Sequence, residues 1–188
     1  MRKNWIPNSG ECVVIDTNIV SYAKRRAYGR SCTALLNQLT QQGIKRVLPQ
    51  IVEYELLRHT RSTKEYTATQ KWLSTEFIKW PMSEGILRSA TMLHALLYWH
   101  DISQRFAERK DFLEDLLVAA TAGRHQMEQK CKTYILSGDQ GYSLPYLIPV
   151  ARYELLPSKD AGRKQYLHFY EIDVDLINKD WKQYWSKL

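Results

Sequence analysis

The stretch Cys-Val-Val-Ile-Asp-Thr-Asn, residues 12–18, decides the fold of this chain. Its apolar residues predict a buried strand that ends abruptly at Asp16. Residues 133–139, Thr-Tyr-Ile-Leu-Ser-Gly-Asp, have the same pattern and end at Asp139. Ligands of an open parallel sheet bind at the carboxyl ends of its strands. We therefore expect the two carboxylates to lie at one binding edge.

The rest of the chain alternates between strand and helix patterns, which predicts βαβ units and the α/β fold class. Strands are expected at residues 11–16, 45–48, 77–80, 133–136 and 153–156, and helices at residues 18–26, 31–42, 50–58, 60–76, 83–99 and 111–127. This order predicts a three-layer α/β/α domain, residues 1–156, with a mostly parallel central sheet of four to five strands. Residues 157–188 are expected to pack on it as an extension, with strand character at 166–172 and a final helix after Asp173.

Three residues mark where predicted helices begin. Ser31 and Ser83 each precede a helical pattern and are expected to be N-caps. Pro49 is expected at a first helical position, where its missing N–H is not needed.

Two of the predicted helices each carry an acid to the same edge. Glu55 shares a helical face with apolar residues of 50–58, so it, rather than Glu53, is expected to point inward. Asp115 lies near the start of residues 111–127, a helix that is apolar on most sides and therefore central. Four carboxylates at one place repel one another unless cations bind. Because clustered oxygen ligands select Mg²⁺ or Mn²⁺, the acids predict a metal site.

The composition favours a polyanionic partner. The chain has 188 residues, 27 basic and 20 acidic side chains, and a formal net charge of +7. The candidate nucleic-acid contacts are Lys24, Arg25, Arg26, Arg58 and Arg61. Solvated helix faces are the simpler interpretation of any one basic cluster. Since neither a membrane-length apolar run nor a signal-peptide core is present, we expect a cytoplasmic protein without membrane contact.

The cysteines and histidines suggest no metal chemistry of their own. The three cysteines, Cys12, Cys32 and Cys131, form no CxxC pair, and Cys12 and Cys131 are expected to be buried free thiols at strand starts. None of the five histidines has zinc-ligand spacing to a cysteine or to another histidine. The spacing therefore argues against a zinc site.

Four motifs together resemble those of a known family. Val-Ile-Asp-Thr-Asn (14–18), Tyr-Glu-Leu-Leu-Arg (54–58), Asp-Leu-Leu-Val-Ala-Ala-Thr-Ala (115–122) and Ile-Leu-Ser-Gly-Asp (135–139) resemble the acidic motifs of PIN-domain nucleases. The likeness extends to the toxin ribonucleases of bacterial toxin–antitoxin pairs and covers residues 11–156. His59 stands where the family often has glycine, and residues 157–188 run beyond its last expected strand.

The resemblance implies an Mg²⁺- or Mn²⁺-dependent endoribonuclease of toxin type. It assigns the catalytic, metal-binding acids as Asp16, Glu55, Asp115 and Asp139, with Thr17, Asn18 and Ser137 supporting these carboxylates or the bound water. RNA is then the substrate, and a cognate antitoxin and a second copy of the chain in a homodimer are the implied partners.

Other interpretations stay open for single residues. Asn18 also suits a helix N-cap, Asp115 a first-turn acid favoured by the helix dipole, and Asp139 a turn before Gly141. Trp181 and Trp185 suit packing on the core, or stacking with bases.

Two other functions compete with the nuclease. One is an RNA-binding or regulatory protein on a PIN scaffold that no longer cleaves, against which the presence of all four acids argues. The other is a phosphatase-like enzyme with Asp16 as nucleophile, which usually needs a second aspartate at the position of Asn18.

Overall fold

The computed structural model describes residues 1–24, 27–100, 112–139, 146–157 and 164–186 of the chain. The strands are β1 (Arg2–Lys3), β2 (Cys12–Ile15), β3 (Lys45–Pro49), β4 (Ile78–Trp80), β5 (Thr133–Ser137), β6 (Leu147–Leu155) and β7 (Gln165–Ile172). The described helices are α1 (Thr17–Lys24), α2 (Gly29–Gln41), α3 (Gln50–Arg58), α4 (Thr63–Glu76), α5 (Glu84–Trp99), α7 (Phe112–Gln129) and α8 (Val174–Trp185).

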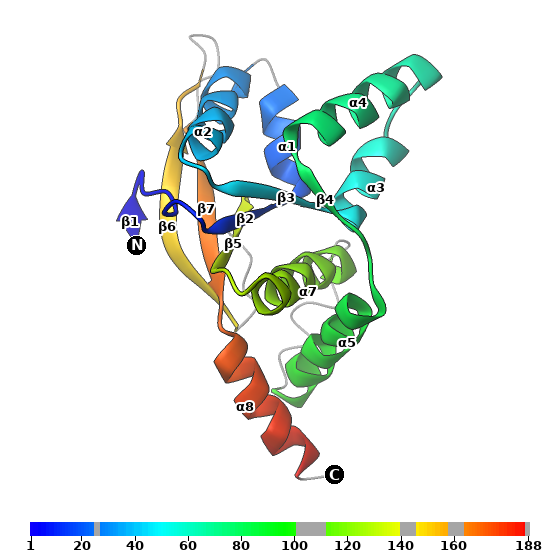
Figure 1. The fold of residues 1–188 in the computed structure, drawn as a ribbon, viewed down its shortest axis with the longest axis vertical. Helices are drawn as coiled ribbons and strands as arrows, with labels where there is room; N and C mark the ends of the chain where they lie inside the picture. Colours follow the sequence, from blue (N-terminus) through cyan, green and yellow to red (C-terminus); the bar gives the residue numbers. More distant parts are fainter. Residues whose placement is uncertain (25–26, 101–111, 140–145, 158–163, 187–188) are drawn as a thin grey trace.

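The strands form one sheet in the order β1-β6-β7-β5-β2-β3-β4. Strands β5, β2, β3 and β4 are parallel to one another, whereas β7 is antiparallel to both β5 and β6. Helices α1 and α2 cover one face, and α7 with α5 covers the other (Figure 1). The predicted α/β class, with three layers and a mostly parallel sheet, is confirmed.

The sheet has seven strands rather than four to five. Strand β1 has two residues, too few to give a sequence pattern. Strand β7 supplies the second extra strand, because Leu167 and Phe169 are fully buried when it lies between β5 and β6. The boundary at residue 156 stays a prediction, although this strand from the extension is an internal strand of the sheet.

The centre of the fold is apolar, as the sequence pattern predicts. Val13, Val14 and Ile15 of β2 are fully buried between the two helical layers. The middle of α7 is buried on all sides from Leu116 to Gly123. Burial of such side chains contributes about 1.5–3 kcal/mol each, so the strand that leads to Asp16 is firmly anchored in the sheet.

Several boundaries differ from the sequence prediction. Helix α2 begins at Gly29 with Tyr28 at its N-cap, so Ser31 lies inside the helix, where its hydroxyl accepts a hydrogen bond from the backbone N–H of Leu156 at 3.1 Å. Helix α4 begins at Thr63 rather than at residue 60. Pro49 ends β3 and caps α3 without entering it.

Strand β6 begins at Leu147, six residues before the predicted start at 153. Pro149 interrupts the strand pattern there, and the pairing with β7 shifts register between Pro149 and Ala151. Ser83 is the N-cap of α5 as predicted, since its hydroxyl accepts from Ile86 N–H at 3.2 Å.

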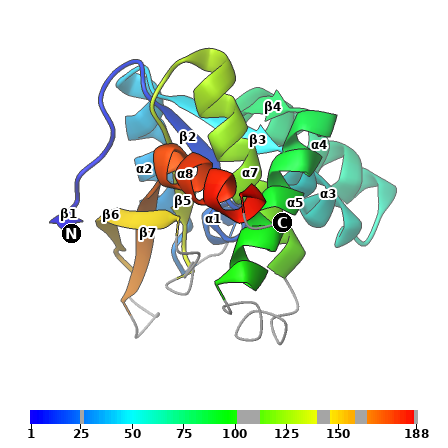
Figure 2. The same ribbon diagram turned by 90° about the horizontal axis from the view of Figure 1, so that it is seen from below.

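The C-terminal helix α8 lies beside α5 (Figure 2). Trp181 packs against the core and stacks on Tyr184 with ring centroids 5.4 Å apart, which favours packing over base stacking for this residue. Trp185 is 58% exposed. None of the described helices is long and apolar enough to cross a membrane.

Candidate metal centre at the carboxyl ends of β2 and β5

Asp16 follows β2 directly, and its carboxylate is held by three donors. Oδ1 accepts from Thr17 N–H at 2.6 Å, and Oδ2 accepts from Asn18 Nδ2 at 2.8 Å. The Ser137 hydroxyl, at the end of β5, donates to the same Oδ2 at 2.6 Å. Asp16 is only 8% exposed. The ends of the two central strands are therefore joined through one buried carboxylate.

The amide of Asn18 fixes the loop after β5. Its Nδ2 lies 3.0 Å from Ser137 Oγ, and its Oδ1 accepts from Gly138 N–H at 2.7 Å. Asp139 N–H in turn donates to Ser137 Oγ at 3.0 Å. Asn18 lies within α1, and its side chain bonds to residues at the carboxyl ends of β2 and β5, so it holds the carboxylate of Asp16 instead of capping a helix.

Gly138 is required at its position for steric reasons. A Cβ built on it would lie 2.5 Å from Cε2 of Tyr22, closer than side chains approach one another. The missing side chain lets the loop that carries Asp139 pass directly over α1. The glycine between Ser137 and Asp139 is therefore part of the geometry of the site.

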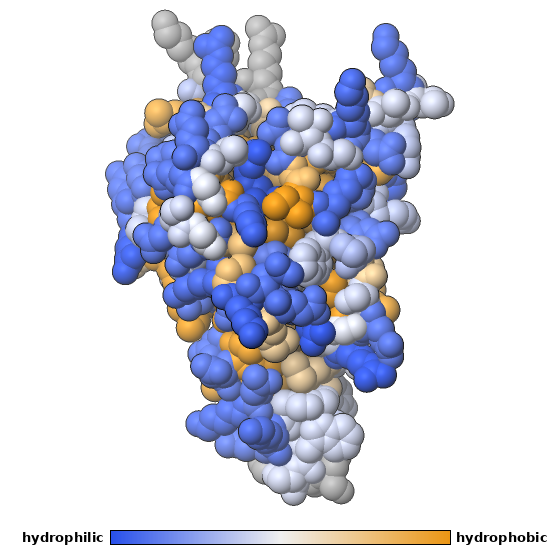
Figure 3. Space-filling view, in the orientation of Figure 1, coloured by the Kyte–Doolittle hydropathy of each residue, from blue (hydrophilic) through white to orange (hydrophobic). Residues whose placement is uncertain are grey.

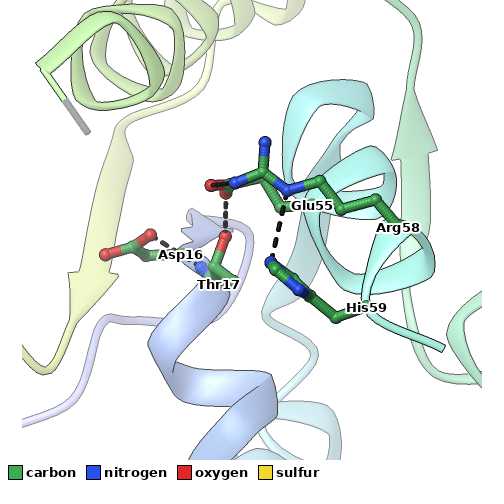
Figure 4. A network of polar contacts seen from close by, with 5 residues as sticks. All are labelled: Asp16, Thr17, Glu55, Arg58 and His59. Atoms are coloured by element: carbon green, nitrogen blue, oxygen red, sulfur yellow. Dashed lines mark hydrogen bonds and ion pairs between the residues drawn. The ribbon is translucent and has the colours of Figure 1, made fainter. Parts of the chain in front are cut away.

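Glu55 approaches the same edge from α3. The hydroxyl of Thr17 donates to Glu55 Oε2, and Arg58 Nη2 lies 3.8 Å from Oε1 (Figure 4). Glu53, in contrast, pairs with Lys79 of β4. The two side chains are similarly covered, at 12% exposed for Glu55 and 16% for Glu53, so they differ in their partners, and the role of Glu55 stays a prediction.

Asp139 is exposed and lies beside Tyr170 of β7. The Tyr170 hydroxyl donates to the backbone oxygen of Asp139 at 2.8 Å. Burial, followed by the carboxylates of Asp139 and Asp16, raises the pKa of Tyr170 to about 12. Both aspartates are therefore close enough to act on one phenol, although one is buried and the other is exposed.

His168 is a second β7 residue at this edge, opposite Ser137 in the antiparallel pairing. Its buried Nε2 has no hydrogen-bond partner among the residues that the structure describes. Burial and the charge of Arg152 lower the pKa of His168, while Asp139 opposes the shift. Sequence analysis selected neither His168 nor Tyr170, because residues 166–172 indicated a strand but not which strands it would join.

Asp115 is half-buried in the first turn of α7, a helix that contacts β2, β5 and α3. Its role in the site stays a prediction. Among the described residues, no three acidic side chains place an oxygen each within 4.8 Å of one another. The close connection is the one from Asp16 through Thr17 to Glu55.

The charge of Asp16 is poorly compensated. Burial raises its pKa to about 6; hydrogen bonds from Ser137 and Thr17 oppose the shift, and the nearby charge of Glu55 adds to it. No basic side chain forms an ion pair with Asp16 in the described part of the chain. A buried carboxylate with neutral donors favours uptake of either a proton or a cation.

The predicted basic contacts differ in how far they reach solvent. Lys24 Nζ donates to Thr69 Oγ1 at 3.0 Å, and burial lowers its pKa. Arg58 lies over the ring of Tyr54 at 5.7 Å, and Arg61 is exposed. Arg25, Arg26 and the predicted turn residue Gly141 lie outside the described residues.

A second cluster lies at the opposite ends of the same strands. Cys12, His125 and Cys131 bring their ligand atoms within 4.8 Å of one another. The spacing argument against a zinc site therefore missed a cluster that the fold assembles, because Cys12 and Cys131 are 119 residues apart in sequence.

Comparison with known proteins gives similarity of structure only. No family model matches the chain, and no curated protein matches it. A solved structure of VapBC2 from Rickettsia felis bound to a DNA fragment from their promoter is similar over 65% of this chain and 85% of that chain, with 16% identity and a TM-score of 0.48. FitAcB from Neisseria gonorrhoeae is similar over 64% of this chain and 84% of that chain, with 17% identity and a TM-score of 0.44. At such identities and scores, a function has to be argued from the residues of the site.

Proposed function

We propose that this protein is an Mg²⁺- or Mn²⁺-dependent endoribonuclease of PIN type that hydrolyses RNA as toxin ribonucleases do. One observation carries the proposal. The buried carboxylate of Asp16 is held by donors from β5 and α1 and is connected to Glu55 through Thr17. This is an oriented carboxylate pair at the edge where ligands of parallel sheets bind.

The donor set fits a hard divalent cation. The pKa of Asp16, raised to about 6, reflects a buried charge that a cation would neutralise. Carboxylate oxygens without sulfur or imidazole ligands suit Mg²⁺ or Mn²⁺. The residues that would hold the ion are Asp16, Glu55, Asp115 and Asp139. When bound, the ion supplies activation of water and stabilisation of charge on the scissile phosphate.

The chain's own side chains orient the acids. Thr17 donates a hydrogen bond to each acid: its N–H donates to Asp16, and its hydroxyl donates to Glu55. Asn18 and Ser137 fix the other oxygen of Asp16. Such outer partners hold ligands in one geometry before the ion arrives, which raises affinity for the ion.

The surface near Glu55 suits single-stranded RNA. A groove of about 390 Å³ between α3 and α4 is lined by Tyr54, Arg58 and Tyr66, among other residues. Exposed aromatic rings and a guanidinium are groups on which bases stack. The face drawn in Figure 3 is largely hydrophilic, with apolar side chains in scattered areas. The net charge of +7 would strengthen phosphate binding at low salt.

The proposal extends to the partners of a toxin. A small antitoxin and a homodimer would follow from a toxin role, as would a cytoplasmic location. Light scattering of the purified chain, and co-expression with the product of the neighbouring reading frame, test these parts separately from cleavage.

The test is cleavage of structured and unstructured RNAs by the full chain with Mg²⁺, Mn²⁺ or a chelator. We expect cleavage that needs the ion and is lost in Asp16→Asn. Glu84→Gln, which changes an exposed acid of α5 that pairs with Arg88, is the control and should cleave normally. Equal cleavage by wild type and Asp16→Asn would remove the proposal. If the chain binds RNA but neither cleaves it nor binds Mn²⁺, the result would favour a non-cleaving RNA-binding protein on a PIN scaffold.

A further inference from the structure

Three soft ligand atoms meet at the amino ends of β2 and β5. The Sγ atoms of Cys12 and Cys131 are 3.0 Å apart, and Cys131 Sγ is 4.0 Å from Nδ1 of His125. All three atoms lie within 4.8 Å of one another. This is the arrangement expected of ligands that share one ion.

The fold fixes each of the three residues independently. Cys12 begins β2, pairs with Thr133 in the parallel register, and donates its N–H to the oxygen of Lys132 at 2.9 Å. His125 projects from α7, which ends shortly before β5. Lys130, with a φ of 50°, reverses the chain between that helix and the strand. Helix, turn and strand therefore bring the three ligands together.

The imidazole is held before any ion binds. His125 is 3% exposed, and its ring lies 4.6 Å from that of Trp80 in an edge-on arrangement. Its Nδ1 is 3.1 Å from Thr133 Oγ1, and this contact is given up when Nδ1 binds the ion, while the Thr133 hydroxyl keeps its hydrogen bond to the backbone oxygen of Cys131 at 3.1 Å. Burial lowers the pKa of His125, which favours the neutral ring that binds metals.

We propose that Cys12, His125 and Cys131 form a binding site for a single cation of the Zn²⁺ class, separate from the acidic centre. Two thiolates and an imidazole are typical zinc ligands, and bonds of ~2.3 Å to sulfur place tetrahedral ligand atoms roughly 3.5–3.8 Å apart. The spacings of 3.0 and 4.0 Å lie on either side of that value. Small rotations of the side chains complete the geometry.

Binding releases the two thiol protons as the two sulfur–metal bonds form, with no change in oxidation state. Cys131 is the partly exposed member of the cluster. Water would therefore reach the fourth coordination position of the ion from the side of Cys131. The ion would connect β2, β5 and α7 at the end opposite to Asp16. We therefore assign it a role in holding the scaffold, without contact to RNA.

A disulfide between Cys12 and Cys131 is the competing use of the same sulfurs. A disulfide would use only the two sulfur atoms and would leave the buried imidazole of His125 without a role. Disulfide formation needs an external two-electron oxidant, and counting thiols in the protein as purified, before any reductant is added, distinguishes the two.

The experiment is a Co²⁺ titration of the reduced full chain, read by the sulfur-to-cobalt charge-transfer absorption, followed by displacement with Zn²⁺. We expect one ion, loss of the band in Cys131→Ser, and affinity for Zn²⁺ weakened more than about 10-fold in that variant. Cys32→Ala, a buried thiol outside the cluster, and Asp16→Asn should keep the band. Zn²⁺ should also protect Cys131 from alkylation, measured by mass spectrometry.

Circular dichroism establishes that each variant is folded, and His125→Gln gives a second test of the ligand set. The absence of a charge-transfer band in folded, reduced wild type would overturn the proposal. So would a band that Cys131→Ser leaves unchanged, or a Cys12–Cys131 disulfide that persists in reductant. Asp16→Asn leaves the Cys12, His125 and Cys131 site intact. Failure of the zinc proposal can therefore be distinguished from failure of the nuclease proposal.

Discussion

Strands β2 and β5 carry different chemistry at their two ends. At the carboxyl ends, the carboxylate of Asp16 and the hydroxyl of Ser137 supply hard oxygen atoms. At the amino ends, Cys12 and Cys131 meet a buried imidazole, which gives a set of soft donors. Burial is strong at both ends. The cations that we propose for the two ends therefore differ because the ligand atoms differ, and not because one site is deeper than the other.

The largest expected effect is on cleavage at the oxygen end. Glu55→Gln should lower the rate by about 100-fold or more, the scale on which groups that stabilise transition-state charge act. Glu53→Gln should lower it far less, because Glu53 pairs with Lys79 and lines the groove between α3 and α4 without contacting Thr17. Single-turnover RNA cleavage in Mn²⁺ measures both. Equal losses in the two variants would break the contrast between the faces of α3.

The second effect is on stability as a function of pH. The pKa of Asp16 is raised from 3.8 to about 6, so the folded chain binds more protons than the unfolded chain in this window. Without metal, the contribution of Asp16 to stability therefore falls as pH rises from about 4 to about 6, by up to roughly 3 kcal/mol. Above that window Mn²⁺ should bind best, since it no longer competes with the proton.

Denaturant unfolding of metal-free wild type and Asp16→Asn at several pH values isolates this contribution. The stability of wild type relative to the variant should decrease with rising pH. The pH window of 4 to 7 follows from the pKa values of 3.8 and about 6. If the difference in unfolding free energy between wild type and Asp16→Asn stays constant across this window, the pKa of Asp16 is not raised.

The third effect concerns the sulfur end. Zn²⁺ at a concentration 100-fold above its dissociation constant should stabilise the fold by about 2.7 kcal/mol, which raises the melting temperature by roughly 5–10 °C. Calorimetry should find this rise in wild type and in Asp16→Asn, and should not find it in Cys131→Ser. A rise that requires Asp16 instead would mean that Zn²⁺ binds at the oxygen end.

The smallest effect is steric. Gly138→Ala places a Cβ 2.5 Å from Tyr22 Cε2, so the loop with Asp139 has to shift, at a cost of about 1–2 kcal/mol and with reduced cleavage. Gly85→Ala is the control, since its Cβ meets only the flexible end of the Arg124 side chain. Thermal unfolding compares the two. Equal stability of both variants would contradict the packing argument.

The oxygen end was largely predictable from sequence. A buried apolar strand that stops at an acid indicates a parallel strand end, and helical periodicity selected Glu55 over Glu53. These signals are local, because strand and helix periods fix the direction of neighbouring side chains. Asp115 shows the limit of such reasoning: its helix was predicted, but its distance to the other acids depends on how the layers pack.

The sulfur end and β7 were not predictable in the same way. Cys12 meets Cys131 only because β2 and β5 pair in parallel across 119 residues of sequence. Tyr170 and His168 reach the acidic edge only because β7 lies between β5 and β6. Pairing partners are set by the whole sheet, and no local period encodes them.

The most direct test of the account is Mn²⁺ binding by calorimetry to wild type, Asp16→Asn and Cys131→Ser. We expect Asp16→Asn to lose Mn²⁺ binding and Cys131→Ser to retain it unchanged. Equal Mn²⁺ binding by wild type and Asp16→Asn would contradict the assignment of the oxygen end as the catalytic metal centre.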